Sequence, residues 1–233
     1  MHDASAPLPI VILISGNGSN LQAIIDETAR KALPVEIRAV ISNNPSAFGL
    51  ERARRAGIPA LVLDHKTFPG RDAFDAALQT MIDRFEPALV VLAGFMRILG
   101  PGFVTHYLGR MINIHPSLLP ALPGLDTHNR ALGTGMREHG ASVHFVTNEL
   151  DGGPVIIQAR VPILPDDNVK TLAQRVLMQE HHIYPLAIRW FAQGRLQLDH
   201  EHNQVVLDGT PLTSPVDYTD ADNNPQTRHA DPQ

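Results

Sequence analysis

The sequence predicts an α/β protein built on an open, mostly parallel, doubly wound sheet in a single domain. Two observations lead to this fold class. Short apolar runs of strand length alternate with segments of helical period along the first half of the chain. The chain has 233 residues, of which 43% are hydrophobic, enough for one large core. Parallel strands joined by helices form a sheet that is covered on both faces.

The first half of the chain reads as strands that alternate with helices. The strands are predicted at Leu8–Ile14, Val35–Ile41, Ala60–Leu63 and Ala88–Leu92. The first helix is expected to start directly after Gly18, because apolar residues then recur with helical spacing and Ser19 with Gln22 has the pattern of a capping box. The next helices are predicted at Ser46–Ala56 and Asp72–Phe85.

The second half has a looser pattern. Strands are predicted at Met111–Ile114, Ala141–Val146 and Val155–Val161, and a long helix at Val169–Phe191, interrupted by Pro185. The segments RLQLDH and QVVLDG predict an edge hairpin. From Thr210 to Gln233 the sequence is polar and rich in Pro and Asp, so we expect a domain over 8–209 and a disordered tail over 210–233.

Composition excludes several classes of function. The formal charge of −5 and the pI near 6.2 argue against a nucleic-acid partner. The absence of cysteine excludes disulfides, thiolate zinc sites and a cysteine nucleophile. The start, MHDASAP, lacks a positively charged region, and the apolar run after it is too short for a signal core or a membrane span. We therefore expect a soluble cytoplasmic protein that is a monomer or a weak homodimer and has no membrane partner.

No pattern of histidines predicts a metal site. His181 and His182 are neighbours on a helix and face different ways, and His200 and His202 lie in the predicted hairpin without further ligands at suitable spacing. We expect no metal cofactor.

A glycine-rich turn follows the first strand in the stretch ISGNGSN. Gly16 and Gly18 fit the first two glycines of a dinucleotide-binding motif, but Leu21 occupies the third position and no acid follows the second strand. A tight turn that exposes backbone N–H groups at a helix start remains a good site for one small anion. The alternative is that the glycines only turn the chain.

Polar residues gather at the end of the strand Met111–Ile114. Asn113 and His115 are two residues apart, so they point to the same side of that strand, and His115 opens a proline-rich loop. Asp151, before a Gly-Gly-Pro turn, could serve the histidine. A single histidine at a strand end is more often structural, and an Asp before glycine is common in turns. These residues alone indicate catalysis weakly.

Five segments, in the order ISGNGSNLQAII, VVLAGFMRIL, NIHPSLLP, HFVTNELDGGPVI and QEHHIYPLAI, resemble the glycinamide ribonucleotide formyltransferase family, folate-dependent enzymes of purine synthesis. The resemblance spans Leu8 to Gly209. It implies the open, mostly parallel sheet that the apolar runs also predict.

The resemblance also implies roles for individual residues. It makes Asn113, His115 and Asp151 the catalytic trio. The substrate's phosphate and ribose are implied to bind at Gly18, Ser19, Asn20 and Glu180. Folate is implied to bind at Arg71, Met96, Arg97, Ile98, Leu99, Asn113, Thr147, Asn148, Glu149, Leu150 and Asp151. Leu122 stands where relatives often carry an aromatic residue, and Asn148 where they often carry an acid. Without the resemblance, Met96–Leu99 would read as an ordinary turn between a strand and a helix.

The implied reaction moves the formyl group of the co-substrate 10-formyltetrahydrofolate to the amine of 5'-phosphoribosylglycinamide. Acyl transfer passes through a tetrahedral oxyanion, which the Asn113 amide and a protonated His115 could stabilise, and the carboxylate of Asp151 would favour the protonated ring. No nucleophilic side chain is needed.

Other functions remain as alternatives. Formyltetrahydrofolate hydrolase and the enzyme that formylates methionyl-tRNA have similar Asn-His-Asp sites. The tRNA enzyme carries an added basic C-terminal domain, for which the residues after Gly194 are too few and too acidic. The hydrolase carries an extra N-terminal regulatory domain, whereas here the first strand begins at Leu8. A catalytically silent nucleotide-binding module is the alternative from a different class.

Overall fold

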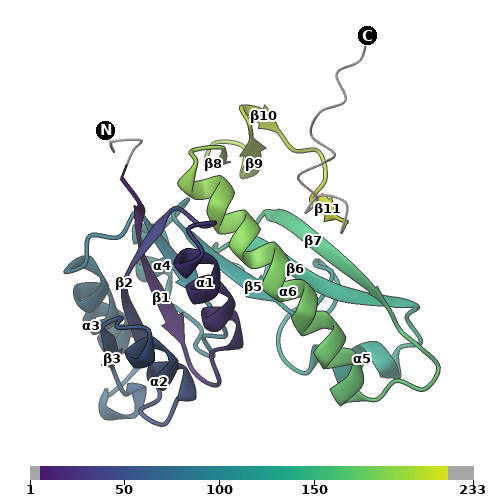
Figure 1. Cartoon of the computed structure of the whole chain (residues 1–233), viewed down its shortest axis with the longest axis horizontal. Helices are drawn as coiled ribbons and strands as arrows, with labels where there is room; N and C mark the ends of the chain where they lie inside the picture. The colour runs from purple at the N-terminus through teal and green to yellow at the C-terminus, as the bar shows by residue number, and fades with distance from the viewer. Residues whose placement is uncertain (1–5, 220–233) are drawn as a thin grey trace.

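The main feature of the fold is one eight-stranded sheet with the strand order β11-β7-β6-β5-β4-β1-β2-β3. The computed structural model describes residues 6–219. Five neighbouring pairs of this sheet are parallel, and only β5–β6 and β6–β7 are antiparallel within the described part. The predicted open, mostly parallel sheet is therefore confirmed (Figure 1).

The strands of this sheet are β1 (Leu8–Ile14), β2 (Val35–Ser42), β3 (Ala60–Val62), β4 (Leu89–Leu92), β5 (Met111–His115), β6 (Glu138–Phe145), β7 (Val155–Pro162) and β11 (Val216–Tyr218). A second, three-stranded sheet consists of β8 (Leu196–Asp199), β9 (Gln204–Leu207) and β10 (Thr210–Pro211). The helices are α1 (Ser19–Ala29), α2 (Phe48–Arg55), α3 (Arg71–Asp83), α4 (Pro101–His106), α5 (Thr127–Gly133) and α6 (Val169–Ala192), with a short 3-10 turn η1 (His65–Thr67).

Helices cover both faces of the large sheet, as the doubly wound prediction requires. β1 is buried along its whole length, and its side chains alternate between two cores. Ile10, Ile12 and Ile14 belong to the core under α1, α2 and α6, whereas Val11 and Leu13 pack with α3 and α4. In Figure 1, α6 lies across the face of the sheet beside α1.

The start of α1 differs from the predicted capping box. The helix begins at Ser19 as expected, but its N-cap is Gly18, in the left-handed conformation with φ 73°, and no side chain of the described residues caps it. Ser19 is thus the first helical residue and too far along to act as the cap. Gln22 contacts Asp26 and Arg52 instead.

Pro185 does not interrupt the last helix, contrary to the prediction. α6 runs without a break from Val169 to Ala192. Proline removes one helical hydrogen bond, but this part of α6 is anchored by tertiary contacts. Pro185 and Ile188 are buried, and the Tyr184 hydroxyl donates toward the carbonyls of Leu92 and Ile112, at 2.9 and 3.1 Å. Packing therefore outweighs the local cost.

The C-terminal segment also departs from the prediction. The expected hairpin forms as β8 and β9, but it lies in the separate small sheet rather than at the edge of the large one. Within the expected disordered tail, β10 pairs with β9, and β11 adds a parallel edge strand to β7, where Tyr218 is buried. The apolar Val216 and Tyr218 alternate with Asp217, a strand pattern too short to notice in a polar segment. Residues 220–233 lie outside the described residues.

Two short helices, α4 and α5, were not predicted. They have six and seven residues, fewer than the two turns that show helical periodicity. They lie before and after β5, the strand that carries Asn113 and His115.

Candidate active site

The polar cluster predicted at β5 forms around Asp151. Ile112 and Ile114 face the core that contains α6, so Asn113 and His115 point to the opposite face of the sheet, as strand alternation predicts. The Oδ2 atom of Asp151 lies 3.5 Å from Nδ1 of His115. The side chains of both residues are nearly buried, with 10% and 7% of their surface exposed. The structure therefore brings the trio to one place.

Asp151 owes its position to its backbone and to a neighbouring loop. Its φ of 51° is in the left-handed region, which Asp adopts more readily than most residues. Its Oδ2 accepts a hydrogen bond of 2.8 Å from the backbone N–H of Gly124. The loop after β5 also fixes the ring of His115, because Nε2 lies 3.0 Å from the carbonyl oxygen of Leu122. Since a carbonyl only accepts, Nε2 carries the proton in this arrangement.

His144 is a fourth member of the cluster that the sequence analysis missed. It lies opposite Asn113 in the β5–β6 register, and its Nε2 is 3.8 Å from Oδ1 of Asp151. Burial is the main reason why the pKa of His144 is lowered. Its Nδ1 donates to the carbonyl oxygen of Phe145, at 2.9 Å.

The neutral His144 ring sets the orientation of Asn113. With the proton on Nδ1, Nε2 of His144 accepts a hydrogen bond of 3.2 Å from Nδ2 of Asn113. The amide of Asn113 thus points an N–H group at His144 and keeps its second N–H for another acceptor. An amide held in this way can donate to an oxyanion without having to reorganise.

A pocket of about 140 Å³ adjoins the cluster and contains most of the residues expected at the folate site. Its walls include Asn113, His144 and two loops, of which the first contributes Arg97, Ile98 and Leu99 and the second Thr147, Asn148, Glu149, Leu150 and Asp151. Arg71 and Met96 are not among the lining residues. Met96 is 64% exposed, and Arg71 begins α3 beside Gly100.

Hydrogen bonds hold the 96–100 loop from both sides. The backbone N–H of Met96 donates to Oγ of Ser15, at 2.7 Å, and Ser15 in turn donates to Asn43. The backbone N–H of Gly100 donates to Oδ2 of the buried Asp75, also at 2.7 Å. Burial raises the pKa of Asp75. Ser15 belongs to the glycine-rich turn, so it links that turn directly to the 96–100 loop.

The glycine-rich turn is held by α2 as well as by its own helix. Gly18 packs so closely on Gly49 that a Cβ atom at position 18 would lie 2.7 Å from the Gly49 Cα. Arg52 donates from Nε to the carbonyl of Asn17, at 2.9 Å, and from Nη2 to its side chain, at 3.1 Å. Without a side-chain cap at Gly18, the first N–H groups of α1 remain open to an anion.

Asn20 and Glu180 form a buried pair beside this turn. Nδ2 of Asn20 donates to Oε2 of Glu180, at 2.6 Å, which brings α6 against the start of α1. Of the predicted anion-binding residues, Asn20 thus directs its amide toward Glu180. Burial raises the pKa of Glu180 to about 7, although the Asn20 hydrogen bond opposes that rise.

Two searches of residues 6–219 found nothing. Over this range, no set of three or more His, Cys, Asp or Glu side chains is placed to hold a metal ion. No helix of this part of the chain has the length and apolar character needed to cross a membrane.

Comparison with known proteins adds an independent line of evidence. The sequence profile of the formyl transferase family matches residues 8–188. A phosphoribosylglycinamide formyltransferase of Escherichia coli is 59% identical over 203 residues, which are 87% of this chain and 95% of that protein. One of Haemophilus influenzae is 46% identical over the same length. The structure of the Coxiella burnetii phosphoribosylglycinamide formyltransferase in complex with CHES aligns with a TM-score of 0.87 and 57% identity, and covers 91% of this chain and all of the other.

Proposed function

The chain belongs to the formyl transferase family, and we propose that it transfers the formyl group of 10-formyltetrahydrofolate to the amine of 5'-phosphoribosylglycinamide. The products are formylglycinamide ribonucleotide and tetrahydrofolate, and the reaction belongs to purine synthesis. The similar proteins of Escherichia coli and Coxiella burnetii bear the name of this activity. The observation that carries the proposal is the buried Asn113, His115 and Asp151 cluster beside the 140 Å³ pocket.

The proposed reaction is direct attack by the amine. The glycyl nitrogen forms a bond to the formyl carbon, and the carbonyl oxygen becomes an oxyanion. The intermediate then collapses as the bond from the formyl carbon to the folate nitrogen breaks. The second N–H of Asn113 can donate to the oxyanion, and the Asn113–His144 hydrogen bond supports this role because it fixes the amide.

His115 is proposed to supply positive charge near the oxyanion and a proton for the departing folate nitrogen. The Asp151 carboxylate, 3.5 Å from the ring, stabilises positive charge there. The amine loses a proton during the same reaction, so proton release and proton uptake balance. Because the amine itself is the nucleophile, no side chain has to form a covalent intermediate.

The two substrates are proposed to enter from different sides of the cluster. The ribonucleotide phosphate binds the N–H groups of Gly18, Ser19 and Asn20, and Glu180 holds the ribose. Folate binds the pocket between the 96–100 and 147–151 loops, and Arg71 lies at the outer end. The Ser15–Met96 hydrogen bond supports this arrangement, since it keeps the two binding regions in contact.

Initial-rate assays with the purified protein test the proposal. Folate product should form only when both substrates are present, in a one-to-one ratio with formylated ribonucleotide. Folate release without ribonucleotide would identify a hydrolase and contradict the proposal. No turnover with either substrate set would indicate a binding module.

A further inference from the structure

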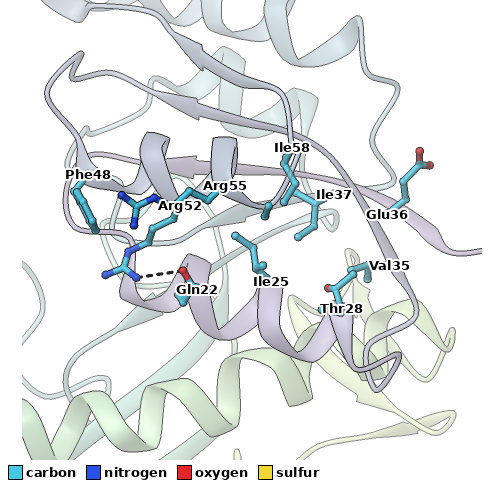
Figure 2. Close-up of a pocket in the computed structure, with 12 residues that line it drawn as sticks. Gln22, Ile25, Thr28, Val35, Glu36, Ile37, Phe48, Arg52, Arg55 and Ile58 are labelled. Atoms are coloured by element: carbon cyan, nitrogen blue, oxygen red, sulfur yellow. Dashed lines mark hydrogen bonds between the residues drawn. The ribbon is translucent and has the colours of Figure 1, made fainter.

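The largest hollow of the described chain lies outside the proposed active site. It is a groove of about 630 Å³ between α1 and α2. Ile25 of α1, Ile37 of β2 and Ile58 after α2 form its apolar part (Figure 2). None of the residues assigned to the trio, the anion loop or the folate pocket lines it. Its volume falls within the range of small-molecule sites.

One end of the groove is positively charged. Arg52 and Arg55 line this end, and their guanidinium carbons lie 4.9 and 5.9 Å from the ring centre of Phe48. Arg52 uses three of its five N–H groups to bind Asn17 and Gln22. Nε of Arg55 donates to Glu51, at 2.8 Å, which leaves its terminal N–H groups for another acceptor. Both arginines thus have free donors.

The other end of the groove has no competing charge. Glu36 belongs to the lining residues, but Figure 2 shows its carboxylate directed away from the isoleucines. It pairs with Arg38, at 3.1 Å. The groove therefore combines a cationic end, which carries an aromatic ring, with an apolar body.

From this combination we propose that the groove binds a small amphipathic anion, a carboxylate or sulfonate on an alkyl chain or ring. The acidic head would accept hydrogen bonds from Arg52 and Arg55, whose guanidinium groups match the geometry of carboxylates. The apolar part would lie against Ile25, Ile37 and Ile58 and remove their exposed surface from water. An apolar cation of the same length meets two arginines at this end and is rejected.

Arg52 connects the groove to the anion loop, a consequence that rests on the proposed function. It holds Asn17 by two hydrogen bonds, so an acid bound in the groove competes with Asn17 for the same guanidinium. The loop then loses part of its support. Occupancy of the groove therefore lowers the affinity for the ribonucleotide, and the ribonucleotide lowers the affinity for the acid by the same factor.

Methyl NMR of isoleucine-labelled protein, titrated with octanoate, tests the site without any need for activity. The expected result is saturable shifts at Ile25, Ile37 and Ile58 with a dissociation constant of about 1 mM or tighter. Acetate and octylammonium should give no saturable shift at these methyl groups. No saturation by octanoate, or equal binding of octylammonium, would overturn the proposal.

Two variants locate the bound acid. Ala29→Phe fills the groove from the exposed end of α1 and should abolish the octanoate shifts, whereas Ala76→Phe, on the exposed face of α3, is the matched control and should leave them unchanged. Arg55→Gln removes one charged partner and should weaken octanoate about tenfold, since a hydrogen bond to a charged group contributes about 1.5 kcal/mol or more. Unchanged octanoate binding in Ala29→Phe would contradict the assignment to this groove.

Calorimetry tests the connection through Arg52 separately. Saturating octanoate should raise the dissociation constant of 5'-phosphoribosylglycinamide about fivefold or more, the lower end of typical coupling between sites. Ribonucleotide binding that octanoate does not change would contradict the coupling. A protein that binds octanoate but no ribonucleotide would contradict the proposed function and leave the groove intact.

Discussion

The anion loop at the start of α1 and the polar cluster on β5 and β6 are built in opposite ways. The loop relies on backbone: Gly18 packs on Gly49, and no side chain of the described chain caps the helix. The cluster relies on side chains, because Asn113, His115 and His144 hold one another or Asp151 in a nearly buried place. The loop should therefore be sensitive to added volume, and the cluster to the loss of single functional groups.

Removal of the Asn113 amide should produce the largest change. Asn113→Ala deletes the proposed oxyanion donor and should lower kcat by about 100- to 1000-fold, the effect of losing one oxyanion donor. Steady-state kinetics measure this effect. Asn129→Ala, which removes an exposed amide on α5, is the control and should keep kcat near that of the wild type. An unchanged kcat in Asn113→Ala would remove the cluster from the chemistry.

Added volume in the loop should act on binding instead. A methyl group at Gly18 meets the Gly49 backbone and a left-handed φ, whereas one at Gly16 has nothing within 4 Å. Gly18→Ala should weaken ribonucleotide binding about a hundredfold, because two hydrogen bonds to a charged group contribute about 3 kcal/mol or more. Gly16→Ala should bind normally, and folate affinity should be unchanged in both variants. Calorimetry decides, and equal losses in the two variants would refute the role of backbone packing.

Glu180 is the buried charge of the loop region, and it should make stability depend on pH. Its pKa is about 7 in the folded protein and 4.5 in the unfolded chain, so the folded state binds more protons between these values. Stability therefore falls as the pH rises from about 4.5 to 7, by up to about 3 kcal/mol.

Glu180→Gln removes this titration. Urea unfolding at pH 5 and pH 8 should show that the variant loses most of the pH-dependent fall in the free energy of unfolding. The matched control, Glu201→Gln in an exposed turn, should retain it. A variant with the same fall as the wild type would show that Glu180 does not titrate in this range.

The edge strand β11 should affect stability and neither binding region. Truncation after Ser214 removes β11 and the buried Tyr218. We expect it to lower the Tm by about 3–6 °C relative to a truncation after Thr219, since burial of a large side chain contributes about 1.5–3 kcal/mol. Calorimetric scans of the two truncated proteins measure the difference. A loss of ligand affinity in the shorter protein alone would mean that β11 supports the site.

The sequence predicts the local part of each region better than the contacts between segments. The glycine turn, and the placement of Asn113 and His115 on one face of a strand, follow from short motifs and strand alternation. His144, Arg52 and Ser15 were missed, because their contacts depend on the β5–β6 register and on the packing of α2 and the 96–100 loop.

Pro185 and β11 show the same limit for the fold. Local rules predict a break at Pro185 and disorder after Thr210, yet buried neighbours keep α6 continuous and sheet pairing orders Val216–Tyr218. Local preference is a weak guide wherever tertiary contacts are strong. The antiparallel register that places His144 could not be derived from the sequence of either strand by itself.

A single-turnover measurement on His115→Ala, saturated with both substrates, tests most directly whether the cluster performs the chemistry and the loop the binding. The account predicts that 5'-phosphoribosylglycinamide and 10-formyltetrahydrofolate bind with affinities close to those of the wild type. Formyl transfer should then be slower by about 100-fold or more, the usual contribution of a general acid or base. Transfer at the wild-type rate in the saturated variant would contradict the account.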